Sequence, residues 1–172
     1  MFVNPDKASG AWRGHHVRMS AVVDRLRALG HELPPAPPSV ASYLGASQVG
    51  NVVYLAGHGP WKGDRFIYIG KLGRELDVPT GRDAAELVAL NCLATLQAYI
   101  GDLDRVRRVV KLFGMVNSMP DFTDQPKVID GASELLQGAF GADAGRHARS
   151  AVGMAALPAG IGVELEMIVE ID

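Results

Sequence analysis

The sequence has little cysteine, little net charge and no long apolar run, and each shortage excludes a class of protein. Its single cysteine, Cys92, excludes an intramolecular disulfide framework and a cysteine-based zinc site. A formal net charge of -2 and a pI near 6.2 give no overall attraction to nucleic acid or to an anionic membrane. No apolar run approaches the roughly 20 residues needed to span a bilayer. We therefore expect a cytoplasmic protein whose partners are small molecules.

Common nucleotide-binding and hydrolase motifs are missing as well. The stretch 57–62 lacks the third glycine of a dinucleotide-binding fingerprint, and no Gly-x4-Gly-Lys-Ser/Thr phosphate loop occurs. No Gly-x-Ser-x-Gly elbow occurs, and Cys92 falls in the middle of a predicted helix. Nucleotide binding of those kinds, a serine hydrolase triad and a thiol nucleophile are therefore not supported.

The composition suits one globular domain, since 48% of the 172 residues are hydrophobic and can bury a proper core. Residues 1–18 are predicted to be a loose, flexible extension, because polar residues interrupt any apolar period and no apolar signal-peptide segment occurs. His15 and His16 have no third ligand nearby, so we expect them to be solvated and predict no metal site. The domain is expected to span 19–172 and to begin with a helix between Ser20 and Gly30.

Apolar periodicity predicts two further helices and six strands. The prolines between 34 and 38 exclude a helix and predict an extended connector. One helix is expected from Thr80 to Gly101, and a second over 128–140 that stops at Gly141. Strands are expected over 39–46, 51–56, 65–70, 107–116, 147–152 and 163–171, the first two joined near Gly50 and Asn51.

The resulting order, β-β-β-α-β-α-β-β, indicates the α+β class. Three strands would open the sheet as an antiparallel unit, and the two helices would cover one of its faces. The other face then needs burial against another surface. Self-association is the simplest way to bury it.

Arg149 and Glu164 are the first candidates for chemistry. Residues 163–171 alternate apolar and acidic side chains, which is the pattern of a strand with one buried face. If 157–160 forms a turn, antiparallel pairing places Arg149 across from Glu164. A guanidinium oriented by that carboxylate could bind a substrate carboxylate with its other donors. The alternative is a cross-strand ion pair that only stabilises the hairpin.

The order of elements and several short motifs resemble the RidA/YjgF family of reactive-intermediate deaminases, also labelled endoribonuclease L-PSP. The matching positions are Tyr43, 50–57 (GNVVYLAG), Pro60, Asn91, Leu96, 101–106 (GDLDRV), Arg149 with Ser150, Leu157 with Pro158, and 164–166 (ELE). The resemblance covers roughly 19–172. It implies a chorismate-mutase-like fold and homotrimers with clefts between subunits. It also implies hydrolysis of enamines and imines, such as 2-aminoacrylate, to a 2-keto acid and ammonia without a cofactor.

The same resemblance implies roles for individual residues. Arg149 would bind the carboxylate of the imino acid, and Glu164 would orient Arg149 and take a proton from water. Tyr43 would close the pocket and donate a hydrogen bond. A backbone group between Ala151 and Gly153 would position the leaving nitrogen.

Two positions depart from the family's best-studied branch. Ala56 stands where a serine is usual and Ala151 where a cysteine is usual, so two polar groups of the pocket are missing. His58 and Trp61 lie where they could rebuild it. His58 is therefore a substrate-binding candidate, although a histidine after a strand often only satisfies a turn.

Two other functions remain open. One is a trimer that binds or senses a small carboxylate through Arg149 without turnover. The other is ribonuclease activity or RNA binding through the basic cluster 105–111. The chain lacks a cluster of aromatic residues for base stacking and has no excess of basic over acidic residues. RNA binding is therefore the weaker alternative. Glu166 and Glu170 are expected to be solvated or at an interface.

Overall fold

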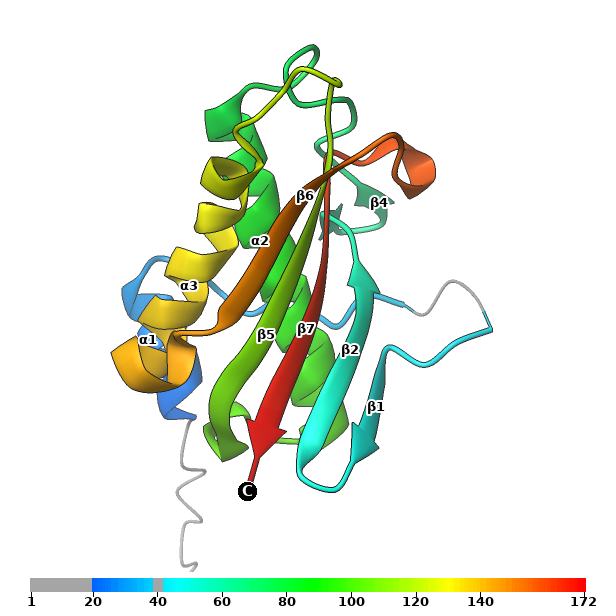
Figure 1. Cartoon of the computed structure of the whole chain (residues 1–172). Helices are drawn as coiled ribbons and strands as arrows, with labels where there is room; N and C mark the ends of the chain where they lie inside the picture. Colours follow the sequence, from blue (N-terminus) through cyan, green and yellow to red (C-terminus); the bar gives the residue numbers. More distant parts are fainter. Residues whose placement is uncertain (1–19, 39–41) are drawn as a thin grey trace, which may run out of the picture.

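The computed structural model describes residues 20–38 and 42–172, which form a five-stranded sheet with helices on one face (Figure 1). The helices are α1 (Ala21–Ala28), α2 (Val78–Ile100) and α3 (Gln125–Gly145), with short 3-10 turns at Leu103–Arg105 and Pro158–Gly160. The strands are β1 (Ala46–Val49), β2 (Val52–His58), β3 (Trp61–Lys62), β4 (Arg65–Phe66), β5 (Val106–Asn117), β6 (Ala148–Met154) and β7 (Val163–Ile171). The predicted α+β, chorismate-mutase-like architecture is confirmed.

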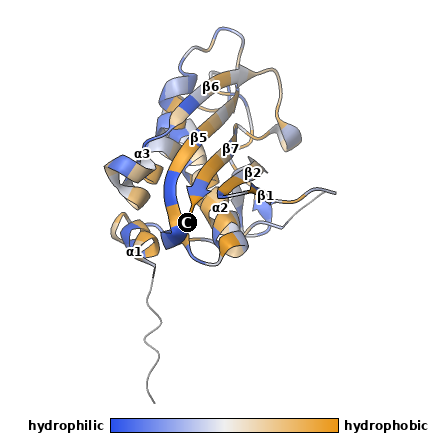
Figure 2. Cartoon of the chain, turned by 60° about the horizontal axis from the view of Figure 1, so that its bottom comes forward, coloured by the Kyte–Doolittle hydropathy of each residue, from blue (hydrophilic) through white to orange (hydrophobic). Residues whose placement is uncertain are grey.

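The sheet has the strand order β1-β2-β7-β5-β6. All neighbours pair antiparallel except β5 and β6, which run parallel. In β7 the residues at odd positions from Val163 to Ile171 are buried, and the residues between them are at least partly accessible. The acidic side of β7 is therefore opposite the core, as predicted. Mostly apolar residues interrupted by polar ones run along the strands (Figure 2).

The helices α2 and α3 cover the inner face of the sheet and pack against each other. Asp77 caps α2, because its side chain accepts a hydrogen bond from the Thr80 backbone N–H, and Gly101 ends the helix with a φ of 86°. The predicted end at Gly101 is confirmed, and the start lies two residues before Thr80. Helix α3 also begins earlier than predicted and is interrupted at Gly141, whose φ is 87°. Cys92 is a buried core residue.

Helix α1 packs on α3 and is attached to the domain through Asp104. The Asp104 carboxylate accepts hydrogen bonds from the Ser20 hydroxyl at 2.7 Å and from the backbone N–H groups of Ala21 and Val22. The predicted Ser20 cap position is correct, but a distant carboxylate rather than the serine satisfies the free N–H groups of the first turn.

The predicted hairpin of β6 and β7 is wrong. Strand β6 pairs with one edge of β5, and β7 pairs with the other. The reason is α3, which carries the chain from β5 back to the start of β6 and so makes those two strands parallel neighbours. The segment 155–162 then crosses to the far side of β5 instead of forming a tight turn.

The predicted three-stranded opening is also wrong in part. The turn at Gly50 and Asn51 is present, but the first strand lies at Ala46–Val49 instead of 39–46, of which 39–41 are outside the described residues. Strand β4 pairs with β3 in a separate small hairpin, not with the main sheet. The backbone at Tyr68, with a φ of 57°, ends the extended conformation predicted for 65–70. The predicted extension 1–18, with His15 and His16, lies outside the described residues.

Candidate functional site

The end of β2 is irregular, and His58 holds the irregularity in place. The pairing with β7 shifts register between Leu55 and His58. The His58 Nδ1 lies 2.7 Å from the Ala56 carbonyl oxygen, and its Nε2 lies 2.8 Å from the Thr95 hydroxyl. Because the carbonyl can only accept, Nδ1 carries the hydrogen, and neutral Nε2 accepts from Thr95. Burial lowers the His58 pKa and favours this neutral form.

Glu164 lies against Gly57 on the helix-free face of the sheet. A Cβ atom added at Gly57 would collide with the Glu164 Oε1, so the glycine leaves room for the carboxylate in its present position. Glu164 is half-buried, and that burial raises the pKa of its carboxyl group, with a further contribution from the negative charge of Glu166. A carboxylate with a raised pKa in a partly dry position can act as a base near neutral pH.

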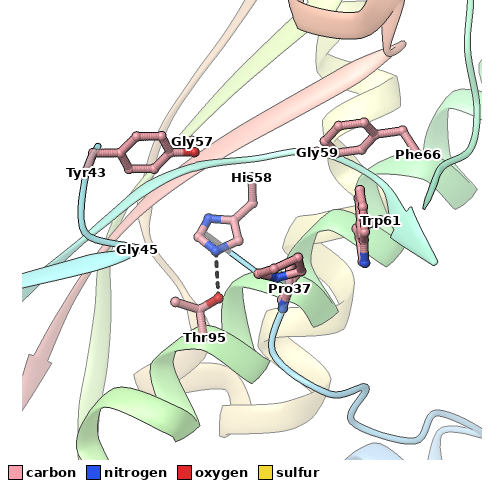
Figure 3. A pocket seen from close by; sticks show the side chains of 10 residues that line it. Pro37, Tyr43, Gly45, Gly57, His58, Gly59, Trp61, Phe66 and Thr95 are labelled. Carbon is pink, nitrogen blue, oxygen red and sulfur yellow. Dashed lines mark hydrogen bonds between the residues drawn. The ribbon is translucent and has the colours of Figure 1, made fainter. Parts of the chain in front are cut away.

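A pocket opens where β2 leaves β1, beside Gly57 (Figure 3). Its volume is about 70 Å³. The rings of Trp61 and Phe66 meet edge to face with centroids 5.0 Å apart. The Tyr43 hydroxyl points toward Gly57, while His58 points the other way, toward Thr95 (Figure 3). The lining residues are Pro37, Pro38, Tyr43, Gly45, Gly57, His58, Gly59, Trp61, Phe66 and Thr95.

Arg149 belongs to a second cluster, at the edge strand β6. Its Nη1 donates to the Asp130 carboxylate at 2.7 Å and to the Ser133 hydroxyl at 3.1 Å, both on α3. The Ser133 hydroxyl is also 3.0 Å from the Nε2 of His147. Burial is the main reason why the His147 pKa is lowered, and the charge of Arg149 adds to it. A cavity opens here beside Gln137.

The structure divides the predicted site residues into two groups. Arg149, Ala151 and Gly153 lie opposite Leu112, Gly114 and Val116 of β5, which are buried on the helix-covered face. Glu164 of β7 lies opposite Met115 of β5 and contacts Gly57 near the end of β2. Tyr43 and His58 line the pocket beside the same glycine. The predicted direct contact of Arg149 with Glu164 is therefore absent within one chain, because the two side chains leave opposite faces of the sheet.

The residues Asp130, Ser133, Thr95 and Phe66 were not predicted. Asp130 and Ser133 are three residues apart, so they share one side of a helix, and this spacing was the available signal. The apolar period of the same helix is the stronger signal in the sequence, and it predicts only that the helix packs on the core. Thr95 and Phe66 carry no signal of this kind, because their positions depend on the β3–β4 hairpin and on the packing of α2.

The protein is thus an α+β domain whose sheet has one face without helices. Its candidate acidic group, Glu164, lies on β7, and its candidate basic group, Arg149, lies on β6. A family model described as "YjgF/chorismate_mutase-like, putative endoribonuclease" matches residues 23–165. The chain belongs to this family, the RidA/YjgF family.

Several known proteins are similar over most of their length. Protein TCP17 of Trypanosoma cruzi is 42% identical over 156 residues, which cover 91% of this chain and 98% of that protein. The 2-iminobutanoate/2-iminopropanoate deaminase of Dermatophagoides farinae is 34% identical over 141 residues, 81% of this chain and 93% of that protein. The crystal structure of Atu1372 from Agrobacterium tumefaciens, a protein of unknown function, has a TM-score of 0.83 at 44% identity and covers 88% of this chain and 93% of that one.

Over 20–38 and 42–172, none of the helices has the length and apolar composition required to cross a bilayer.

Proposed function

We propose that the protein hydrolyses 2-imino and 2-enamino acids to 2-keto acids and ammonia at a site shared by two subunits. Arg149 of one subunit binds the substrate carboxylate, and Glu164 of the neighbouring subunit activates the water. The observation that carries the proposal is that these two groups leave opposite faces of one sheet. Membership of the family and the similarity to a 2-iminobutanoate deaminase support the type of reaction.

Arg149 is suited to bind a carboxylate. Asp130 and Ser133 engage only its Nη1, and Nε and Nη2 have no hydrogen-bond partner in the part of the chain that the structure describes. These two nitrogens form the side of a guanidinium that binds a carboxylate with two parallel hydrogen bonds. Asp130 thus fixes the orientation of the arginine and leaves its binding edge available.

Glu164 is suited to handle a proton. The imine carbon is already electrophilic, so the enzyme has to hold the acid and deliver a water. Glu164 takes a proton from that water as its oxygen bonds to the imine carbon, and the imine nitrogen gains a proton. The amino nitrogen of the resulting carbinolamine takes up a second proton, its C–N bond then breaks to release ammonia, and the hydroxyl loses its proton, which leaves the 2-keto acid. An enamine enters the same path after its terminal carbon takes up a proton and its nitrogen loses one, which converts it to the imine.

Tyr43 lies where it could complete the site. It is 48% exposed, and its hydroxyl points toward Gly57, on which Glu164 rests. A phenol at this position can donate a hydrogen bond to the substrate or to the carbinolamine oxygen.

Self-association is part of the proposal, because the shared site requires it. The helix-free face carries accessible apolar side chains, with Tyr54 at 46%, Val110 at 38% and Val152 at 36% exposure. Accessible apolar groups gathered on one face are typical of interaction surfaces. We propose a homotrimer in which the β6 edge of one subunit meets this face of the next.

The basic cluster offers little support for RNA binding. Arg105 pairs with the carboxylate of Asp172 at 3.0 Å, and Arg108 pairs with Glu170 at 2.7 Å. Lys111 donates to the Ser150 hydroxyl. Cations that are already paired contribute less to phosphate binding than free ones.

The direct test is the release of keto acid and ammonia when the purified protein meets freshly generated 2-aminoacrylate or a bulkier 2-imino acid. We expect release faster than in the protein-free control, and Arg149→Ala should reduce kcat/KM at least about a hundredfold, as loss of a bidentate charged contact does. The matched variant is Arg27→Ala, which removes an exposed arginine on α1.

Equal rates with and without the protein across several imino acids would overturn the proposal. If 2-keto acids still bound in an Arg149-dependent manner, the chain would instead be a carboxylate-binding protein.

A further inference from the structure

The pocket beside Gly57 is walled by carbon, and we propose that it selects 2-imino acids with a large apolar side chain, branched or aromatic, over 2-aminoacrylate. This inference rests on the proposed function and names its substrate class. Trp61 is the specificity-determining residue.

The apolar wall comes from the β3–β4 hairpin. The Trp61 indole and the Phe66 ring pack edge to face with an interplanar angle of 85°, and Pro37 and Tyr43 face the same pocket. Figure 3 shows the two rings of the hairpin on one side of the pocket and Tyr43 on the other. An apolar side chain placed between them would move from water into contact with apolar surface. Each methylene buried in this way increases the binding affinity about fourfold.

Apart from the Tyr43 hydroxyl, which faces Gly57, the polar side chains around the pocket already have hydrogen-bond partners. His58 uses one ring nitrogen for the Ala56 carbonyl and the other for the Thr95 hydroxyl. The Trp61 Nε1 donates to the Gly63 carbonyl at 3.0 Å, so this indole N–H is also engaged. A polar substrate side chain that reaches Trp61 would therefore lose its water without gaining a side-chain partner there, which weakens its binding.

The wall is held in a fixed position. Asn91, which is fully buried, donates from Nδ2 to the Gly59 carbonyl at 3.1 Å and to the Trp61 carbonyl at 3.0 Å. Trp61 also pairs with Phe66 as neighbours in the hairpin. A pocket that is already ordered loses little free energy when a substrate binds. Differences in fit between substrate side chains therefore appear more fully in the affinity.

The pocket is connected to the proposed chemistry through Gly57. The Glu164 carboxylate rests against Gly57, and Gly57 lines the pocket. An imino acid whose reacting carbon lies at Glu164 can direct its side chain past Gly57 toward Trp61. The volume of about 70 Å³ is several times the ~10–15 Å³ that one water needs, so a side chain of several carbon atoms fits.

The test compares kcat/KM of the wild-type protein for 2-imino acids with methyl, isobutyl and benzyl side chains. We expect the isobutyl or benzyl substrate to exceed the methyl substrate at least about tenfold. Trp61→Ala should reduce this ratio at least about fivefold, whereas Arg65→Ala, an exposed residue of the same hairpin, should preserve it. An equal or higher kcat/KM for the methyl substrate overturns the inference, and this result needs no variant.

Dissociation constants of the corresponding 2-keto acids separate this inference from the proposed function. If no imino acid is hydrolysed, the proposed function fails, and tighter binding of the isobutyl keto acid than of pyruvate still supports the pocket. If hydrolysis occurs but neither rates nor affinities favour the larger side chain, the selection by Trp61 is wrong and the proposed function stands.

Discussion

Arg149 and Glu164 extend from opposite faces of the same sheet, with β5 between the strands that carry them. Arg149 reaches Asp130 on the helix-covered face, whereas Glu164 rests on Gly57 on the helix-free face. One chain therefore cannot present both groups to one small substrate. Two chains can, if the edge of one sheet meets the open face of another.

This relationship predicts complementation between two inactive variants. Arg149→Ala and Glu164→Gln subunits are each expected to form inactive homo-oligomers. In trimers assembled at random from equal amounts of both, about one quarter of the sites combine an intact Arg149 with an intact Glu164. The measurement is imine hydrolysis after the two chains are unfolded, mixed and refolded together. Absence of recovered activity, with mixed trimers verified by mass, would mean that the site does not join two chains.

Asp130 is expected to position Arg149. Asp130→Ala removes the 2.7 Å bond to Nη1, so the guanidinium becomes mobile before substrate binds. The Asp130 side chain is 41% exposed, so solvent screens its ion pair with Arg149 and the effect of removing it is moderate. We expect KM to rise about fivefold with kcat nearly unchanged. The control is Glu134→Ala, which removes a carboxylate of the same helix that pairs with Arg82. A lower KM in Asp130→Ala would instead mean that Asp130 competes with the substrate carboxylate.

Much of the fold follows from local patterns in the sequence. The alternation in β7 and the glycine after α2 are local signals, and both were predicted correctly. The neighbours of β6 depend on the path of the chain through α3, and no local pattern in the sequence encodes that path, so the hairpin predicted for β6 and β7 is wrong. The left-handed backbone at Tyr68 has no signal either, since tyrosine rarely adopts it and tertiary packing must impose it.

The candidate site was predicted less completely than the fold. The motifs led to Arg149, Glu164, Tyr43 and His58, but the pairing of Arg149 with Asp130 needed the packing of α3 against β6. The Trp61 wall likewise needed the β3–β4 hairpin, which is too short to give a periodic signal.

The raised pKa of Glu164 predicts how kcat/KM depends on pH in the acidic range. Glu164 acts as a base only when deprotonated, so kcat/KM should fall as pH decreases through its pKa, which lies above the usual glutamate value. The charge of Glu166 contributes to that increase. Glu166→Gln should therefore lower the Glu164 pKa and move the acidic limb toward lower pH. An unchanged limb in Glu166→Gln would show that another group titrates there.

The close contact of Glu164 with Gly57 predicts a strong effect of a single methyl group. In Gly57→Ala the added Cβ would occupy the position of the Glu164 Oε1, so the carboxylate must move away from the pocket. We expect kcat/KM to fall at least about tenfold, whereas the free energy of unfolding should decrease by less than about 1 kcal/mol, because the carboxylate is the movable end of a flexible side chain. Urea denaturation measures the second quantity. The matched comparison is Gly57→Ala in a Glu164→Ala background, where the cause of the collision is gone and the alanine should cost less than about 0.5 kcal/mol. A loss of more than about 1 kcal/mol in both backgrounds would mean that the backbone of β2, and not the carboxylate, requires glycine at this position.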